Sequence, residues 1–291
     1  MSPWPIPSRL PRLANDTSHD ASVGEDVDAK PEGNRPRRCT NSPIRVTVPK
    51  TSGLRAGAGL ARAVKCRVLS TGREVALRRA DASRNRESAE RKAESRTSFD
   101  KQAEHYDSSY YGRHGKGIHR HILDRMAAFD CNSVLDVGCG TGNFLWELSK
   151  ARPNVKLCGL DISGKMLEIA KKRLGDEADL RTGDSEHLPW NGGSFDVITC
   201  TDSFHHYPNP KAVLLEFRRV LKHSGRVMIA DPWAPYILRQ VGNFLILFSR
   251  SGDTRLYSKR EMERLMVDAG YALTSWQRVG WISCLVVGTA P

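Results

Sequence analysis

The sequence predicts an α/β fold of the Rossmann-like, doubly wound class over roughly its last two thirds. Two observations support this prediction. From Ser98 onward, apolar runs of strand length alternate with segments of helical period, which is typical of βαβ units and a parallel sheet. One predicted strand also runs directly into a glycine-rich turn that opens a helix, VLDVGCGTGN at residues 134–143.

The predicted elements follow one another in regular alternation. Strands are expected at residues 133–139, 156–162, 178–182, 195–200, 225–230, 272–279 and 282–288. Helices are expected at residues 143–151, 165–174, 211–221 and 258–269. The last helix has a clear start signal, because Ser258 is followed three residues later by Glu261 in the pattern of a capping box.

Residues 1–96 differ in composition from the rest of the chain. They contain 20 Lys and Arg against 11 Asp and Glu, and so carry most of the net charge of +12. Residues 1–52 are dense in Pro, Ser, Asn and Asp and cannot bury enough apolar surface to offset the entropy of ordering. We therefore expect a disordered basic leader over 1–96, with a solvated helix allowed at 79–96, and one folded domain over 97–291. A basic arm that contacts nucleic acid or anionic lipid is the alternative to a dispensable tail.

Composition excludes several classes of protein. The seven cysteines form no CxxC pair and no Cys/His cluster with zinc-ligand spacing, so we predict no metal site and a reducing compartment. No apolar run is long enough to span a bilayer, and the N-terminus lacks the continuous apolar segment of a secretory signal. We therefore expect a cytoplasmic protein.

The glycine-rich turn is the most informative motif. Gly138, Gly140 and Gly142 are spaced as GxGxG, which differs from the GxGxxG of dinucleotide-binding proteins and argues against an NAD-dependent oxidoreductase. Glycine permits positive φ and close approach of a ligand to the backbone, and the helix that follows presents free N–H groups. Asp136 precedes the turn on the strand itself.

The string DVGCGTG resembles motif I of the class I S-adenosylmethionine (SAM)-dependent methyltransferases. The segments LPW, SFDVI, HHYPNP and EFRRVLKHSGRVMIAD, together with FDKQAEHYDSSY at residues 99–110, resemble the branch that includes the ubiquinone and menaquinone C-methyltransferases and related small-molecule enzymes. This resemblance covers about two thirds of the chain. It implies a seven-stranded, mostly parallel sheet with helices on both faces and an antiparallel last strand.

The resemblance also implies the residues that bind SAM. Asp161 matches the acid that holds both ribose hydroxyls, Asp184 matches the acid near the adenine amine, and Tyr106 matches the tyrosine near the methionine end. The full set implied for the cofactor is Asp136, Gly138, Cys139, Gly140, Gly142, Asp161, Ile162, Asp184, Ser185, Thr201 and Tyr106.

His205 and His206 are the candidate catalytic residues. They follow the fourth predicted strand, at the carboxyl edge of the sheet where ligands bind in open α/β folds. An imidazole there could take a proton from a phenol, amine or enol as it attacks the methyl group. Alternatively the pair is a structural feature of this loop, since methyl transfer often needs only positioning.

The expected reaction is methyl transfer from SAM to a small-molecule acceptor, giving S-adenosylhomocysteine. The apolar segment at residues 233–248 reads as a lid over a lipophilic or aromatic acceptor, as a dimer contact, as a membrane-surface helix or as a helix packed on the sheet. The alternatives are an RNA or DNA methyltransferase using the basic arm, and a non-catalytic SAM-binding protein. No nucleic-acid partner is expected, because the [DN]PP[YF] and Pro-Cys motifs of the nucleic-acid enzymes are missing.

Overall fold

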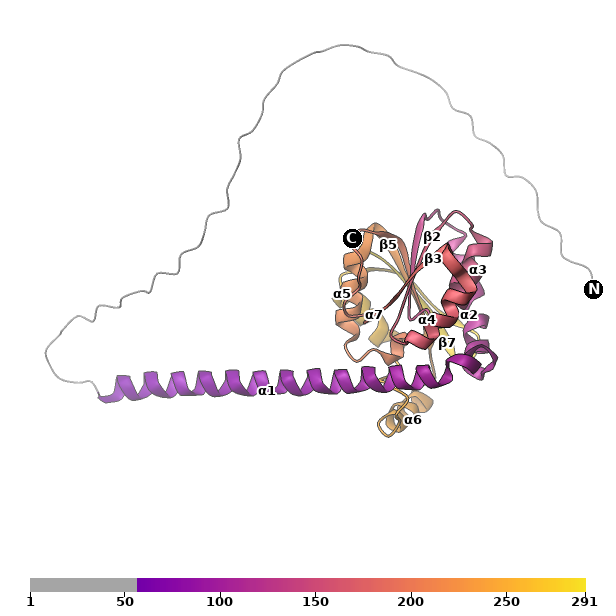
Figure 1. The fold of residues 1–291 in the computed structure, drawn as a ribbon. Helices are drawn as coiled ribbons and strands as arrows, with labels where there is room; N and C mark the ends of the chain where they lie inside the picture. The colour runs from indigo at the N-terminus through magenta and orange to yellow at the C-terminus, as the bar shows by residue number, and fades with distance from the viewer. Residues whose placement is uncertain (1–56) are drawn as a thin grey trace, which may run out of the picture. The chain divides into compact units, whose positions relative to one another are not determined.

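The structure, a computed structural model, describes residues 57–291, apart from the side chains of residues 57–78, Asp81 and Thr274. Residues 58–291 form one unit around a seven-stranded sheet of order β3-β2-β1-β4-β5-β7-β6 (Figure 1). The strands are β1 (Ser133–Val137), β2 (Lys156–Asp161), β3 (Ala178–Thr182), β4 (Phe195–Thr201), β5 (Leu221–Pro232), β6 (Ala272–Val279) and β7 (Ser283–Thr289).

Strand directions match the expected topology. Strands β1 to β5 pair in parallel, whereas β7 lies antiparallel between β5 and β6. All five residues of β1 are buried, as expected for a central strand covered on both faces. The predicted doubly wound sheet with an antiparallel last strand is therefore confirmed.

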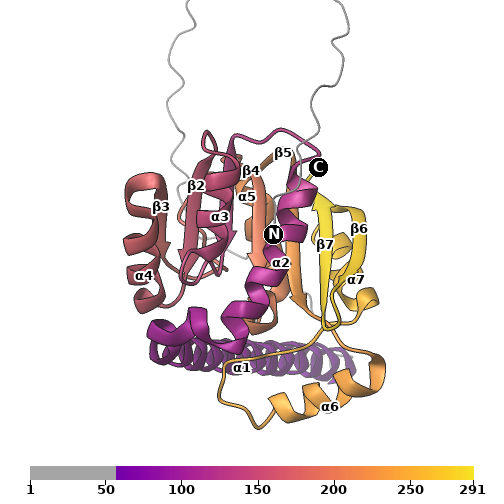
Figure 2. The same cartoon turned by 90° about the vertical axis from the view of Figure 1, so that its right-hand side faces the viewer.

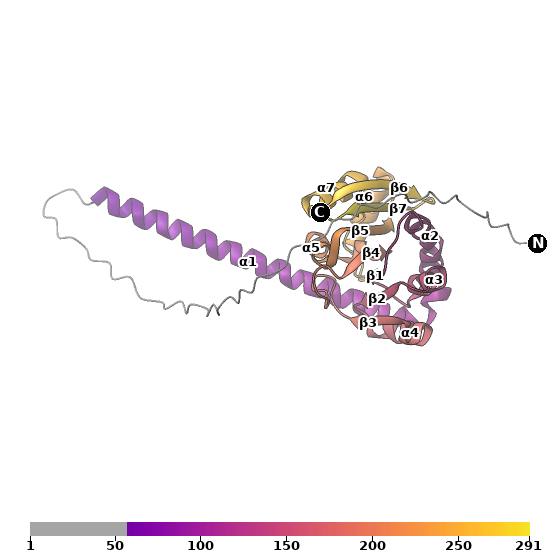
Figure 3. The ribbon, with the colours of Figure 1, turned by 90° about the horizontal axis from the view of Figure 1, so that it is seen from above.

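Helices cover both faces of the sheet (Figure 3). Apolar side chains of α2, α3 and α4 pack on one face, and those of α5 and α7 pack on the other, forming two clusters of buried residues. The helices of the unit are α1 (Gly57–Gln102), α2 (Tyr110–Met126), α3 (Asn143–Ala151), α4 (Gly164–Leu174), α5 (Pro210–Val220), α6 (Tyr236–Ile246) and α7 (Lys259–Asp268). Short 3₁₀ turns are η1 (Ala103–Ser108), η2 (Gly175–Glu177) and η3 (Phe204–His206).

Helix α1 occupies part of the segment expected to be a leader, including the residues 79–96 for which a helix was allowed. Residues 57–96 are helical in the structure, and α1 continues six residues past the expected domain boundary at residue 97. The end of α1 crosses the carboxyl edge of the sheet (Figure 2), and Ser88 and Ser95 are buried there. Contacts with the domain stabilise a polar helix whose sequence alone offers no apolar face. The remainder of the expected leader, residues 1–56, lies outside the described residues.

Close packing of α1 depends on a glycine in the segment that follows α6. Gly252 has φ +84°, and a Cβ atom added there would lie 2.5 Å from the Cα atom of Ser95. A side chain at this position would therefore push α1 away from the domain. Arg91 Nη1 also donates to the carbonyl oxygen of Ser249, at 3.2 Å.

The cysteines of the domain behave as small apolar core residues. Five of them are free and buried: Cys131, Cys139, Cys158, Cys200 and Cys284. Among the described residues, no helix is both long enough and apolar enough to cross a bilayer.

Candidate functional site

The glycine-rich turn lies between β1 and α3 with the geometry that the sequence predicts. Gly138, Gly140 and Gly142 have φ values of +77°, +54° and +75°, in the region that favours glycine. A Cβ atom on Gly138 would lie 2.0 Å from Ser203 Oγ, whereas open space surrounds the Cα atom of Gly140. The turn therefore leaves a backbone cradle that a ligand can approach closely.

Asp161 ends β2 beside this cradle. Its Oδ2 accepts a hydrogen bond from the Gly140 amide, and its Oδ1 accepts one from the Ser163 amide, each at 2.8 Å. Burial raises the pKa of this carboxyl to about 6, although both amide bonds oppose the shift. Asp161 is thus ionised at neutral pH, and each oxygen keeps lone pairs for a further donor.

Asp184 follows β3, and the sequence did not predict its main partner. Lys92 of α1 places its Nζ atom 2.8 Å from Asp184 Oδ2 and 2.6 Å from Glu186 Oε1. Burial alone would lower the pKa of Lys92, but these two carboxylates outweigh burial and raise it. The ammonium therefore links α1 to the loop after β3.

Two buried polar atoms without a hydrogen bond mark the other end of the cradle, although one of them, Asp202 Oδ1, lies 3.8 Å from His114 Nε2. Thr201 Oγ1 and Asp202 Oδ1 are buried and form no hydrogen bond with the described part of the chain. Asp202 has φ +48°, which is uncommon outside glycine, and its amide donates to the carbonyl oxygen of Ala230 at 2.8 Å. Nearby, Asp136 accepts a 2.7 Å hydrogen bond from Thr199 Oγ1, and burial raises its pKa to about 6.

Two adjoining cavities divide the predicted cofactor residues between them. The first is lined by Gly138, Gly140, Asp161, Ile162, Asp184, Ser185, Thr201 and Tyr106. The second is lined by Asp136, Gly138, Cys139, Gly140, Thr201 and Tyr106. Gly142 lines neither, because it serves as the N-cap residue of α3. The structure therefore brings ten of the eleven predicted residues together along one edge of the sheet.

A third cavity, of about 360 Å³, opens beside the first. Aromatic and aliphatic side chains form much of its wall, including those of Phe99, Tyr110, Tyr111, Ile246, Leu256 and Ile282. It shares Phe99, Tyr106, Asp202 and His206 with the first cavity. These shared residues are the boundary between a polar pocket over the glycine turn and a larger apolar one.

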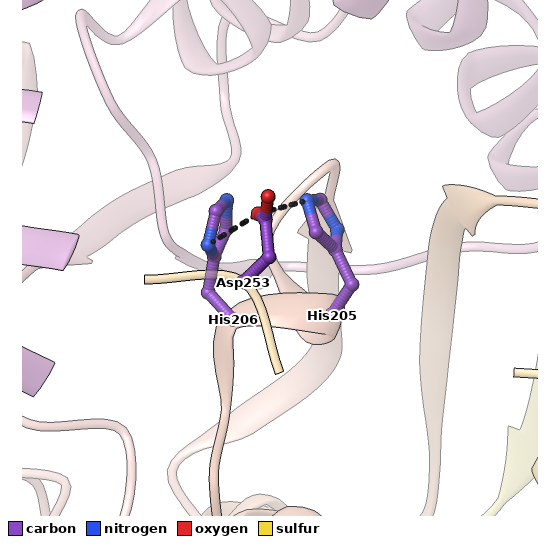
Figure 4. Close-up of side chains that lie close together, drawn as sticks. All are labelled: His205, His206 and Asp253. Carbon is purple, nitrogen blue, oxygen red and sulfur yellow. Dashed lines mark ion pairs between the residues drawn. The ribbon is translucent and has the colours of Figure 1, made fainter. Parts of the chain in front are cut away.

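His205 and His206 both line the third cavity, where they meet Asp253 (Figure 4). His205 Nε2 lies 3.5 Å and His206 Nδ1 lies 3.1 Å from Asp253 Oδ1. The other nitrogen of His205, Nδ1, lies 2.9 Å from Oδ1 of the buried Asp231. His205 is thus held between two carboxylates, one at the end of β5 and one in the loop after α6.

The surroundings of His205, His206 and Asp202 shift the pKa values of these groups differently. Burial would lower the pKa of His205, but the charge of Asp231 and its hydrogen bond outweigh burial and raise it to about 9. Burial and the neighbouring His205 charge lower the pKa of His206 below its usual value. Burial and Asp231 raise the pKa of Asp202 to about 7. At neutral pH, His205 is an imidazolium, His206 is neutral, and Asp202 titrates.

Among the described residues, His205, His206 and Asp253 also form the group whose spacing would allow a metal ion to bind. One ligand atom each from His205, His206 and Asp253 lie within 4.8 Å of one another. The sequence did not indicate this grouping, because Asp253 is about fifty residues from the histidines and no short motif links them. The arrangement also has a proton-based explanation, since the His205 charge is balanced by Asp231 and Asp253.

Sequence reasoning missed the contribution of α1 and of the loop after β4. Lys92, Ser95 and Phe99 line the first cavity from α1, and Asp202 lines all three cavities. Because apolar residues do not recur at helical spacing along α1, the sequence did not predict that this helix contributes to the site. Asp202 carried a positional signal, because it directly follows a strand at the carboxyl edge of the sheet.

Comparisons with known proteins agree with this geometry. A family described as "Methyltransferase domain" matches residues 130–270. Demethylmenaquinone methyltransferase of Thermotoga maritima is 35% identical over 157 residues, which span 53% of this chain and 68% of that protein. The demethylmenaquinone methyltransferase of Lactococcus lactis is 40% identical over 118 residues, 39% of this chain and 47% of that protein. The chain thus spans between about half and two thirds of these relatives.

Solved structures share the fold at lower sequence identity. A putative methyltransferase solved in complex with the Haloferax volcanii Trm112 methyltransferase activator matches with a TM-score of 0.59 and 22% identity, over 68% of this chain and 97% of that one. The YcgJ protein of Bacillus subtilis matches with a TM-score of 0.51 and 21% identity, over 59% and 98% of the two chains.

Proposed function

Because this chain belongs to the SAM-dependent methyltransferases, in the branch of the demethylmenaquinone methyltransferases, we propose that it methylates a small lipophilic acceptor bound in the third cavity. One observation carries this proposal. The apolar cavity adjoins the polar pocket over the glycine turn, and both are lined by Phe99, Tyr106, Asp202 and His206. A methyl donor and an apolar acceptor could therefore meet at these four residues.

The residues of the polar pocket fit SAM. Asp161 keeps lone pairs for a vicinal diol, and the space over Gly140 admits a ligand against the backbone. The buried Thr201 Oγ1, which has no hydrogen-bond partner among the described residues, is an acceptor that suits an ammonium group at the methionine end. Bound SAM would supply a methyl group on a sulfonium, which is activated toward nucleophiles without further help.

We infer the chemical class of the acceptor from the residues that line the third cavity. Aromatic side chains such as Phe99, Tyr110 and Tyr111 favour a flat, apolar body, and burial of such a body is stabilised by its removal from water. Two polar residues of this cavity, Asp202 and His206, also line the cofactor pocket. We therefore infer an acceptor with one polar, proton-bearing end, such as a phenol or an enol.

We assign Asp202 as the group that takes the proton from the methyl acceptor. As the acceptor–CH₃ bond forms and the S–CH₃ bond breaks, the proton of the acceptor moves to the Asp202 carboxylate. A pKa of about 7 suits this task, because the carboxylate is available at neutral pH and still binds a proton well.

The two predicted catalytic histidines take different parts. His205, charged and placed between Asp231 and Asp253, would hold the loop of Asp253 against the end of β5 at the wall of the acceptor cavity. His206 lies at the boundary of both cavities, with its ring edge against Phe99, 5.0 Å between ring centres. It would position the acceptor rather than take its proton, since its pKa is far below neutral.

Transfer of label from methyl-tritiated SAM tests this proposal. The protein is incubated with a cell extract, which is then separated into organic-soluble, aqueous small-molecule, nucleic-acid and protein fractions. We expect label in the organic fraction with the wild type and at least about a hundredfold less with Asp202→Asn. Label in RNA, DNA or protein would overturn the proposal and favour the alternative of a macromolecular substrate.

A further inference from the structure

We propose that α6 and the β6–β7 turn form a docking surface for an anionic lipid membrane at the mouth of the third cavity. Helix α6 contains no buried residue, although it is mostly apolar. Its exposed side chains, and those of the two residues after it, include Ile237, Leu238, Val241, Phe244, Leu245 and Phe248. Phe248 is 74% exposed, which is costly for a large apolar side chain in water.

A second segment extends this apolar surface. The turn between β6 and β7 exposes Trp281 to 88% and Ile282 to 44%. The Trp233 amide, just before α6, donates to the carbonyl oxygen of Ile282 at 2.7 Å, so the turn and the start of the α6 segment are neighbours. Tryptophan favours the interface of a bilayer, where its ring is apolar and its N–H can still reach water.

The surface borders the acceptor cavity. Gly242 and Ile246 of α6 and Ile282 of the turn all line the third cavity. Figure 2 shows α6 beyond the carboxyl edge of the sheet, next to the end of α1. A membrane that covers this surface would therefore face the opening through which a lipophilic acceptor enters, and that acceptor would not have to cross water.

The position of α6 is defined by polar contacts on its inner side. The side chain of Asn243 accepts from the Leu256 amide at 2.7 Å and donates to the Leu256 carbonyl oxygen at 3.1 Å. These contacts hold the apolar side chains of α6 outward, so that they do not pack on the sheet. This geometry is that of an interfacial helix whose apolar face enters the boundary between headgroups and acyl chains.

The basic residues near α6 favour an anionic membrane as the partner that covers this surface. Residues 232–252 contain Arg239 and Arg250 and no acidic residue. Arg250 and Lys101 also face one groove between the end of α1 and the segment after α6, together with the single acidic residue Glu94. Basic side chains beside an apolar helix face are attracted to anionic headgroups. A second copy of the chain fits less well, because a two-fold contact through α6 would bring these like charges together.

Sedimentation with lipid vesicles tests the surface without SAM or acceptor. The full chain is mixed with vesicles of phosphatidylcholine alone, or of phosphatidylcholine with phosphatidylglycerol. We expect the wild type to sediment with the anionic vesicles, and less so as salt is raised. Phe244→Ser/Phe248→Ser should lower the partition coefficient by at least about tenfold, since each serine removes a large apolar side chain from the interface.

Matched controls separate this surface from general effects. Leu215→Ser/Val267→Ser also replaces exposed apolar side chains, on α5 and α7, and should sediment like the wild type. Both double variants should keep the wild-type melting temperature, because all four residues are exposed. Failure of the wild type to bind anionic vesicles, or equal binding of the Phe244→Ser/Phe248→Ser variant, would overturn the proposal. A dimer that the same variant dissociates, without vesicle binding, would show that α6 pairs with a second copy.

The vesicle result stands apart from the proposed function. Only the purpose of docking, access of a lipophilic acceptor, rests on that proposal. Vesicle binding together with label in a nucleic-acid fraction would keep the docking surface and reject the lipophilic acceptor. Label in the organic fraction without vesicle binding would keep the lipophilic acceptor and reject the docking surface.

Discussion

Lys92 Nζ lies 2.8 Å from Asp184 Oδ2, which joins the N-terminal helix α1 to the loop predicted to meet adenine. Glu186 shares the same ammonium. From the sequence, residues 1–96 are expected to be dispensable for SAM binding. The structure places Lys92 and Ser95 in the wall of the first cavity, so removal of residues 1–96 would open that wall.

We expect Lys92→Met to weaken SAM binding by up to about fivefold, because a partly exposed ion pair contributes up to ~1 kcal/mol. The loss arises because Asp184 is no longer held and α1 is less firmly closed over the cavity. Isothermal titration calorimetry measures the change. Arg86→Met, at an exposed position on the same helix, is the control and should bind SAM like the wild type. Equal affinity for Lys92→Met would show that the Lys92–Asp184 ion pair does not contribute to SAM binding.

Asp161→Ala should weaken SAM binding by at least ~1 kcal/mol, since it deletes a charged hydrogen-bond acceptor. Asp161 also accepts from the Gly140 and Ser163 amides, so the alanine variant could loosen the turn itself. Asp161→Asn keeps an acceptor oxygen and is the sharper test, with Asp176→Asn on the surface as its control. Calorimetric affinity that is unchanged in both Asp161 variants would remove this residue from the site.

The methylation rate should follow a bell-shaped dependence on pH. It should rise as Asp202 loses its proton around pH 7 and fall as His205 loses its proton around pH 9. Asp202→Asn should abolish the rise on the acidic side and lower the rate by about 10²–10⁴-fold. The profile is measured with saturating SAM once an acceptor is in hand. A rise near pH 7 that persists in Asp202→Asn would assign the proton to another group.

Ser258→Ala should lower the free energy of unfolding by ~1 kcal/mol, the usual contribution of an N-cap side chain. Ser258 Oγ accepts from the Glu261 amide at 3.2 Å, and Glu261 accepts from the Ser258 amide at 2.8 Å. Urea denaturation gives the difference. Ser258→Thr retains the hydroxyl and should stay close to the wild type, whereas an alanine variant as stable as the wild type would show that α7 does not depend on this cap.

The same cap predicts a loss of stability in acid. Burial would raise the pKa of Glu261, but its bonds to Ser258 and its pairing with Arg255 outweigh burial and lower it to about 2. The stabilisation is therefore present above about pH 4.5 and lost as the pH falls through about 2. The difference in unfolding free energy between wild type and Glu261→Gln should shrink over this range.

The sequence by itself determined the sheet and the cofactor cradle. Apolar runs and helix periods marked every strand and most helices of residues 133–291, because burial on both faces of a parallel sheet leaves a strong pattern. The spacing of the glycines predicted the turn, because positive φ next to a strand end is specified by short-range sequence. The resemblance to the methyltransferases implied Asp161 as its neighbour, and the structure places Asp161 beside the turn.

Tertiary structure alone decided which distant residues meet. Lys92 reaches Asp184 across ninety-two positions, whereas Asp231 meets His205 from the end of β5 and Asp253 meets it from the loop after α6. The resulting pKa values of His205 and Asp202 depend on burial and on these neighbours, neither of which a linear pattern encodes. The outward direction of the α6 side chains was likewise one of several alternatives in the sequence. It was fixed by the contact of Asn243 with Leu256, which holds the polar side of the helix to the domain.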